Sequence, residues 1–200
     1  QHRIPRKSEG YFLKIEKDCI VIAGADERGA YYGVQTLAQL LALDKLPLAE
    51  VTDYPDVPYR GVVEGFYGAP WSQEACIRQL DFYGRNKMNV YIYGPKDDPY
   101  HRTPNWRKPY PAREGEELKV LVNRAKENNV IFYWAIHPGQ DIRWNEEDRS
   151  LLLQKFESMY QLGVRGFAVF FDDISGEGTK ADKQAELLNY IDDHFVKVKR

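Results

Sequence analysis

The chain is poor in cysteine, has no excess of basic charge and has no long apolar run. Its 200 residues include 2 cysteines, Cys19 and Cys76, which lack metal-ligand spacing. We expect them in a strand and a helix respectively, as buried free thiols rather than as a disulfide. With 28 Lys and Arg against 30 Asp and Glu, the net charge of −2 argues against nucleic acid as a partner. No run approaches the roughly 20 apolar residues of a membrane span.

The first residues, Gln1-His2-Arg3-Ile4, contain neither the hydrophobic region of a signal peptide nor an initiator methionine. We therefore expect a processed or excised chain. The sequence leaves its compartment unknown.

The first 55 residues predict a small α/β unit. Residues 11–24 alternate apolar and polar side chains around a central turn, which is typical of a hairpin. Asp26 is placed to cap a helix that runs to about Leu43, and a strand is expected near residues 48–52. A linker with two prolines, residues 53–58, predicts a domain boundary, with one domain at 1–55 and the other at 56–200.

Beyond the linker, strands alternate with helices. The pattern predicts strands at 61–64, 88–93, 130–136 and 166–171, and helices at 73–86, 113–128, 146–162 and 181–196. Ser72 and Asn145 are placed as N-caps. Such alternation indicates a parallel sheet, and four units make half of an eight-unit barrel. A doubly wound sheet would carry a glycine-rich phosphate loop, which we do not find.

Each predicted strand ends in polar residues or glycines: 64–71, 94–98, 137–139 and 172–173. In a barrel of this kind the active site lies where strands end and loops begin. Asp172 and Asp173 follow a buried apolar run and are the leading catalytic candidates. In the alternative interpretation Asp172 caps the loop and Asp173 is solvated. Two close carboxylates resist joint ionisation, so one pKa of the pair should be raised.

Three motifs carry a family resemblance. They are residues 60–68 (RGVVEGFYG), 93–98 (YGPKDD) and 171–174 (FDDI). Together they resemble glycoside hydrolase family 84, the O-GlcNAcases and related β-N-acetylglucosaminidases, over residues 59 to about 197. Residues 1–55 resemble the later part of the small α/β domain that precedes the barrel in bacterial members.

The resemblance implies an α/β fold, the first half of a (β/α)8 TIM-type barrel preceded by part of a small α/β domain. It implies a retaining, substrate-assisted mechanism in which the 2-acetamido oxygen of the sugar attacks its own anomeric carbon to form an oxazoline. By motif position, Asp172 resembles the residue that polarises the acetamido group and Asp173 the general acid/base. Lys96 and Gly65 match positions that bind sugar hydroxyls. A solvated Lys96 and a turn-forming Gly65 are the structural alternatives.

The neighbouring residues are given lesser roles. Asp97 and Asp98 are interpreted as loop-capping groups, with Asp97 fixing Lys96, because no third ligand lies at metal spacing. Tyr67 and Trp71 are interpreted as packing or rim aromatics. His137 is expected as a hydrogen-bonded histidine at a strand end.

The implied partner is a glycan or glycoprotein that contains N-acetylglucosamine, with no metal and no cofactor. A family 20 type hexosaminidase, a hyaluronidase-like glycosidase and a non-catalytic GlcNAc-binding fragment are the alternatives. Family 20 enzymes carry an Asp-Glu pair, which argues against the first of these. We expect the remaining barrel strands to come from sequence outside this chain, and the chain alone to be inactive. Secretion or a periplasmic location is favoured if the source is bacterial.

Overall fold

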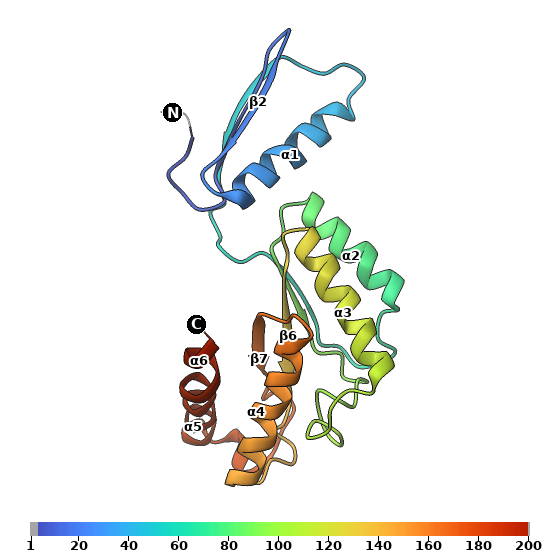
Figure 1. Cartoon of the computed structure of the whole chain (residues 1–200), viewed down its shortest axis with the longest axis vertical. Helices are drawn as coiled ribbons and strands as arrows, with labels where there is room; N and C mark the ends of the chain where they lie inside the picture. Colours follow the sequence, from blue (N-terminus) through green and yellow to red (C-terminus); the bar gives the residue numbers. More distant parts are fainter. Residues whose placement is uncertain (1–3, 200) are drawn as a thin grey trace.

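The computed structural model describes residues 4–199. Residues 1–3, which belong to the stretch considered above for a signal peptide, and residue 200 lie outside the described part. The chain forms an elongated molecule, with a small sheet and one helix at the N-terminal end and a larger sheet with its helices at the other (Figure 1).

The N-terminal unit is an antiparallel sheet covered by one helix. Its elements are β1 (Tyr11–Ile15), β2 (Ile20–Gly24), α1 (Glu27–Leu41) and β3 (Ala49–Asp53), with strand order β2-β1-β3. The carboxylate of Asp26 accepts a hydrogen bond from the Gly29 amide at 2.8 Å, which confirms the predicted cap. Tyr11, Leu13 and Tyr32 form a separate small core between the sheet and α1.

The second unit has four parallel strands in the order β4-β5-β6-β7. The strands are β4 (Gly61–Glu64), β5 (Val90–Tyr93), β6 (Ile131–Ile136) and β7 (Gly166–Val169), and the helices are α2 (Gln73–Arg85), α3 (Ala112–Glu127), α4 (Glu146–Gln161) and α5 (Ala181–Ile191). A short 3-10 turn (Gly176–Thr179) precedes α5, and a π-helical turn (Asp192–Val196) and α6 (Lys197–Lys199) follow it. The side chains of Ser72 and Asn145 cap α2 and α4 as predicted.

One hydrophobic core joins the larger sheet to its helices. Alternate residues of adjacent strands, such as Tyr91, Phe132 and Trp134, face this core and pack with Leu80 of α2 and Phe156 of α4. Because side chains alternate along a strand, the intervening residues lie on the other face of the sheet. Because the four strands are parallel, the loops that follow them emerge together at one end of the sheet.

The strand and helix order matches the prediction, but some boundaries and one cysteine differ. The strand expected from residue 88 begins at Val90, because Asn89 is used at the junction with the N-terminal unit. The strand expected to reach residue 171 ends at Val169. Cys76 is a buried free thiol as expected, but Cys19 is exposed, because it lies in the turn between β1 and β2 rather than inside a strand.

A buried carboxylate joins the two units. Glu9 is 5% exposed and accepts hydrogen bonds from Arg60 at 2.6 Å and from the Asn89 side chain at 2.9 Å. Asn89 also donates to the Pro58 carbonyl at 2.8 Å, while its own side-chain oxygen accepts from the Arg60 amide at 2.9 Å. These contacts hold the linker and the start of β4 against the small sheet, at the end of the larger sheet away from the aspartates.

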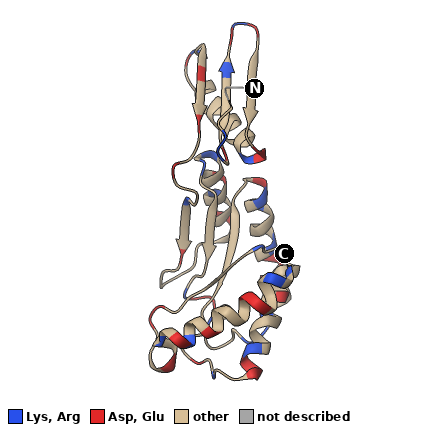
Figure 2. Cartoon of the chain, turned by 90° about the vertical axis from the view of Figure 1, so that its left-hand side faces the viewer, with Lys and Arg blue, Asp and Glu red and all other residues tan. Residues whose placement is uncertain are grey.

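Charges of both signs are mixed along the surface helices. Figure 2 shows acidic and basic residues interleaved along the helical segment that ends at the C-terminus. Within residues 4–199, no helix is both long enough and apolar enough to cross a membrane.

Candidate active site

Backbone hydrogen bonds draw the loops after β4 and β5 together. The Gly94 amide donates to the Glu64 carbonyl at 2.9 Å, and the Lys96 amide donates to the Phe66 carbonyl at 3.1 Å. The Phe170 amide continues the ladder from β7 to β6 by donating to the Ile136 carbonyl at 2.7 Å. The loops that carry Gly65, Lys96 and the aspartates are thus held at one edge of the sheet.

Lys96 and Asp172 form an ion pair in the middle of this edge. The ammonium group of Lys96 contacts Oδ2 of Asp172. The side chain of Lys96 is 2% exposed, whereas that of Asp172 is 52% exposed. A buried ammonium needs a compensating partner, and the half-exposed carboxylate supplies it while remaining open to a ligand.

The surroundings of Asp172 favour its ionised form. Partial burial by itself would raise the pKa of Asp172, but the hydrogen bond and positive charge of Lys96 lower this pKa below its ordinary value. The carboxylate is therefore an acceptor near neutral pH. The sequence predicts that one pKa of the aspartate pair is raised; for Asp172 the direction is the opposite, because the hydrogen bond and charge of Lys96 outweigh the effect of burial.

Asp173 turns away from the strand direction. Its φ of 52° lies in the left-handed region, which Asp tolerates better than most residues. In an extended strand, Asp172 and Asp173 would face opposite sides of the sheet. The left-handed turn instead brings the Asp173 carboxylate to the hydroxyl of Tyr67, which donates to Oδ2 at 2.9 Å.

Tyr67 places the two carboxylates at a common site. Its ring centroid lies 5.7 Å from Nζ of Lys96, the cation that contacts Asp172. The guanidinium carbon of Arg102 lies 5.8 Å from the same centroid, and Arg102 also donates to the Lys96 carbonyl at 3.1 Å. The hydrogen bond to Asp173 raises the pKa of Tyr67, so the phenol remains a donor. The sequence predicts Tyr67 as a packing or rim aromatic, and the structure adds the contact of its hydroxyl with Asp173.

Gly65 leaves space at the same edge. Among the residues that the structure describes, a Cβ built at this position would meet Val63 at 3.4 Å and Phe170 at 3.8 Å, which are ordinary contact distances. Packing within the chain therefore does not require glycine here. At Gly94, in contrast, a Cβ would lie 2.5 Å from the Phe170 ring. The openness at Gly65 is compatible with a ligand that approaches the backbone.

Glu64 anchors the loop that carries Gly65 and Tyr67. Its fully buried carboxylate accepts from the Trp71 amide at 3.0 Å and from the Tyr91 hydroxyl. The loop is thereby tied at its far end to the strand from which it starts. The thiol of Cys76 lies 3.8 Å from the same carboxylate, and burial raises the pKa of Cys76 to about 11, which makes it a poor nucleophile.

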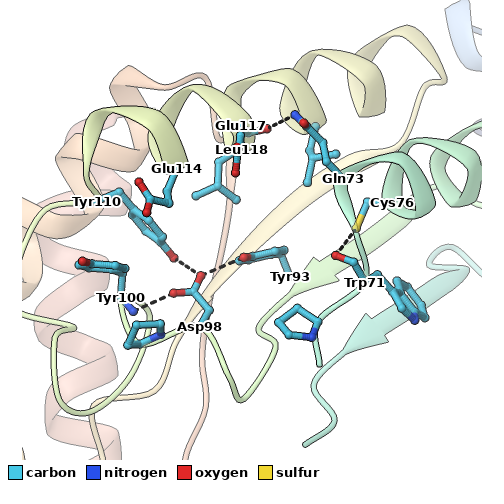
Figure 3. A pocket seen from close by; sticks show the side chains of 13 residues that line it. Trp71, Gln73, Cys76, Tyr93, Asp98, Tyr100, Tyr110, Glu114, Glu117 and Leu118 are labelled. Atoms are coloured by element: carbon cyan, nitrogen blue, oxygen red, sulfur yellow. Dashed lines mark hydrogen bonds between the residues drawn. The ribbon is translucent and has the colours of Figure 1, made fainter. Parts of the chain in front are cut away.

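Asp98 organises the loop after β5. Its carboxylate accepts from the hydroxyls of Tyr93 at 2.9 Å and Tyr110 at 2.7 Å, and from the Tyr100 amide at 2.7 Å (Figure 3). These residues line a cavity of about 330 Å³ between this loop, α2 and α3. Neither Asp172 nor Asp173 lines this cavity, so it is distinct from the site of the aspartates.

The structure supports some of the lesser assignments and corrects one. Asp98 is a loop-organising group as interpreted, and His137, at the end of β6, is hydrogen-bonded to the Asp172 carbonyl. The expectation that Asp97 fixes Lys96 is wrong. Asp97 is exposed, and Lys96 pairs instead with Asp172, 76 positions along the chain. Among residues 4–199 there is no cluster of three or more metal-ligating side chains.

Two family profiles match the chain. A profile described as beta-N-acetylglucosaminidase matches residues 60–200, and a profile for domain 2 of glycosyl hydrolase family 20 matches residues 5–54. The gap between the two matches, residues 55–59, falls at the two-proline linker. The second of them indicates that the small N-terminal unit is of a kind also found in family 20 enzymes.

Comparison of amino-acid sequences finds relatives that match parts of the chain. Protein O-GlcNAcase of Rattus norvegicus is 42% identical over 125 residues, which are 62% of this chain and 14% of that protein. The beta-hexosaminidase of Vibrio vulnificus is 36% identical over 95 residues, 46% of this chain and 11% of that protein.

Solved structures match more of the chain. CpGH84B matches with a TM-score of 0.89 and 47% identity over 96% of this chain and 34% of its own. A mutant of the Thermobaculum terrenum O-GlcNAc hydrolase matches with a TM-score of 0.66 and 32% identity, over 70% of this chain and 32% of its own. The chain thus spans about a third of these two chains and one seventh of the rat protein. With its parallel sheet, its paired aspartates and a profile match over residues 60–200, the chain belongs to the β-N-acetylglucosaminidase family, glycoside hydrolase family 84.

Proposed function

We propose that this chain contributes the catalytic carboxylates of a retaining glycoside hydrolase that removes β-linked N-acetylglucosamine. The observation that carries the proposal is the different environment of two adjacent aspartates. Asp172 is paired with a buried ammonium, whereas Asp173 is bound by a neutral phenol. Asp172 is thereby kept ionised by a cation, and the two carboxylates differ in environment, as the two different roles in acid/base catalysis require.

In the proposed mechanism the substrate supplies the nucleophile. The acetamido oxygen attacks the anomeric carbon as the bond to the leaving oxygen breaks, and an oxazoline forms. Asp172 accepts a hydrogen bond from the acetamido N–H and stabilises the positive charge that develops there. Asp173 gives its proton to the leaving oxygen. Asp173 then takes a proton from the water that opens the oxazoline, and the sugar leaves with its β configuration retained.

Lys96 and Gly65 are proposed to bind the sugar. The ammonium of Lys96 has three hydrogens, so it can donate to a sugar hydroxyl without leaving Asp172. At Gly65 the backbone carbonyl is proposed to accept from another hydroxyl, since a residue without a Cβ lets a ligand approach the backbone. Both residues lie on loops that backbone hydrogen bonds fix to the sheet, which is the support that a binding site needs.

The substrate class follows from the relatives. The rat relative is named protein O-GlcNAcase, so we propose O-linked GlcNAc on serine or threonine of proteins, or a related β-glycoside, as substrate. We also propose that further strands complete a (β/α)8 barrel around the site, because β4 and β7 each have one neighbour among the described strands. The division into domains at 1–55 and 56–200 is part of this proposal.

Two assays on the protein in its natural length test the proposed function. Release of 4-methylumbelliferone from its β-N-acetylglucosaminide distinguishes a hydrolase from a GlcNAc-binding protein without turnover. A series of substrates with increasingly fluorinated acetyl groups then tests participation of the acetamide. We expect the rate to fall with each added fluorine, because fluorine withdraws electrons from the attacking oxygen. No release, or release at a rate independent of fluorination, would contradict the proposal.

A further inference from the structure

Two buried histidines lie directly behind the aspartates. His101 and His137 are 0% and 1% exposed. His101 belongs to the loop after β5, and His137 is the first residue after β6. The backbone amide of His137 donates to the His101 carbonyl at 2.7 Å, so the two residues are neighbours in space.

Each imidazole holds a carbonyl beside the site. Nε2 of His137 lies 2.7 Å from the carbonyl oxygen of Asp172 and 3.4 Å from Oδ1 of the same residue. Nε2 of His101 lies 2.7 Å from the carbonyl oxygen of Pro95, the residue before Lys96. A carbonyl oxygen can only accept, so both Nε2 atoms carry a hydrogen and donate it.

The second ring nitrogen of each histidine, Nδ1, lies where an added proton would have no acceptor. Nδ1 of each histidine is buried and has no hydrogen-bond partner among the described residues. A proton at Nδ1 would therefore be a buried donor without an acceptor. Burial lowers the pKa of His101 to about 4.

The strand order of the sheet explains why the loops that carry Lys96 and Asp172 need a link between them. Lys96 follows β5 and Asp172 follows β7, while β6 lies between these two strands. The ion pair must therefore reach across the end of β6. His137 stands at that end and contacts the Asp172 side, and His101 contacts the Lys96 side. Their mutual backbone hydrogen bond closes the link between the two loops.

We propose that His101 and His137 are positioning residues that hold Lys96 and Asp172 in register across β6, and so fix the orientation of the Asp172 carboxylate. The inference rests on the proposed function, in which that carboxylate orients the acetamido group. Neither histidine needs to touch the substrate. Their role is to supply one neutral hydrogen bond each to the backbone beside a residue of the site.

The test compares His137→Phe with His137→Gln in the protein in its natural length. Phe keeps most of the volume but removes the donor, whereas the amide nitrogen of Gln can replace Nε2. We expect His137→Phe to lower kcat about 10- to 100-fold with KM changed less than about threefold, because misplaced groups act mainly on the transition state. His137→Gln should recover to within about fivefold of the wild type. At His101 we likewise expect the Phe variant to have a lower kcat than the Gln variant.

The outcomes separate this inference from the proposed function. If the wild type releases no GlcNAc, the proposed function fails. If the wild type is active and folded His137→Phe has an unchanged kcat, or if Gln and Phe are equally impaired, the positioning role is overturned. Should His137→Phe not fold, His137→Asn replaces it, because its shorter amide does not reach the Asp172 carbonyl. An Asn variant as active as the Gln variant would also overturn the role.

Discussion

The ammonium of Lys96 is buried while its partner, the carboxylate of Asp172, is half-exposed. The cation therefore acts on Asp172 from the protein side and leaves the solvent side of the carboxylate for a ligand. Burial alone would raise the pKa of Asp172, but the hydrogen bond and charge of Lys96 lower it. The pH at which the proposed activity falls on the acid side should therefore report the effect of Lys96 on the pKa of Asp172.

Replacing Lys96 is expected to shift the acidic limb of the pH profile. Without the ammonium, the pKa of Asp172 rises, because burial favours the neutral acid and the largest opposing effect is gone. In Lys96→Met the acidic limb of kcat/KM should therefore move to higher pH, with a lower maximum. The control is Lys108→Met, which removes an exposed lysine of the same loop. If the acidic limb of kcat/KM does not move in Lys96→Met, the ion pair of Lys96 and Asp172 does not determine the pH at which activity is lost.

Loss of the Tyr67 hydroxyl is expected to weaken the function of Asp173. Tyr67→Phe removes one hydrogen bond of 2.9 Å to that carboxylate. Because this bond helps to hold the Asp173 carboxylate in place beside the leaving group, hydrolysis should slow about five- to tenfold without it. The loss should be larger for leaving groups that need protonation. Tyr59→Phe, at a tyrosine that is 67% exposed, serves as the control and should leave the rate unchanged.

A buried carboxylate beneath the loop after β6 is expected to control acid stability. Asp148 has a fully buried side chain and accepts hydrogen bonds from Arg107 and Arg143. Burial alone would raise the pKa of Asp148, but the two guanidinium groups lower it well below its usual range. Its contribution to stability is thus complete above the ordinary aspartate pKa of about 4, and it is lost as the pH falls from there toward the folded-state pKa.

The substitution Asp148→Asn tests this assignment. At pH 7 it should lower the free energy of unfolding by about 3 kcal/mol or more, since two guanidinium groups lose their buried partner. Below pH 4 the free energy of unfolding should also fall less steeply in the variant than in the wild type, because Asn does not titrate. Urea unfolding followed by tryptophan fluorescence measures both. Glu147→Gln, which affects the exposed pair with Arg143, should cost less than about 1 kcal/mol. Equal losses in the two variants would refute the role of Asp148.

The fold was largely predictable because its signals are local. The alternation of apolar strands with capped helices identified every strand and main helix, and Asp26, Ser72 and Asn145 marked three helix starts correctly. Cys19 was misplaced because an apolar residue next to β2 is compatible with either strand or turn. The strand before Tyr93 was overextended, because Asn89 is recruited by Glu9 from 80 positions away.

The site was only partly predictable because its contacts are distant in sequence. The strand ends indicated which loops meet, and the family motifs singled out Gly65, Lys96, Asp172 and Asp173. Neither kind of signal reveals that Lys96 pairs with Asp172 over 76 positions, or that Tyr67 reaches Asp173 over 106 positions. The left-handed turn at Asp173 had no sequence signal beyond the tolerance of Asp for this conformation.

The division of roles between Asp172 and Asp173 is tested most directly by the leaving-group dependence of kcat/KM in Asp172→Asn and Asp173→Asn. We expect Asp173→Asn to slow alkyl and peptide glycosides about 10²- to 10⁴-fold and activated aryl glycosides far less, since an acidic leaving group needs no proton. Asp172→Asn should slow both classes alike, because acetamide participation is needed in each case. Equal losses for both classes in Asp173→Asn, or rescue of Asp172→Asn by an activated leaving group, would contradict the account.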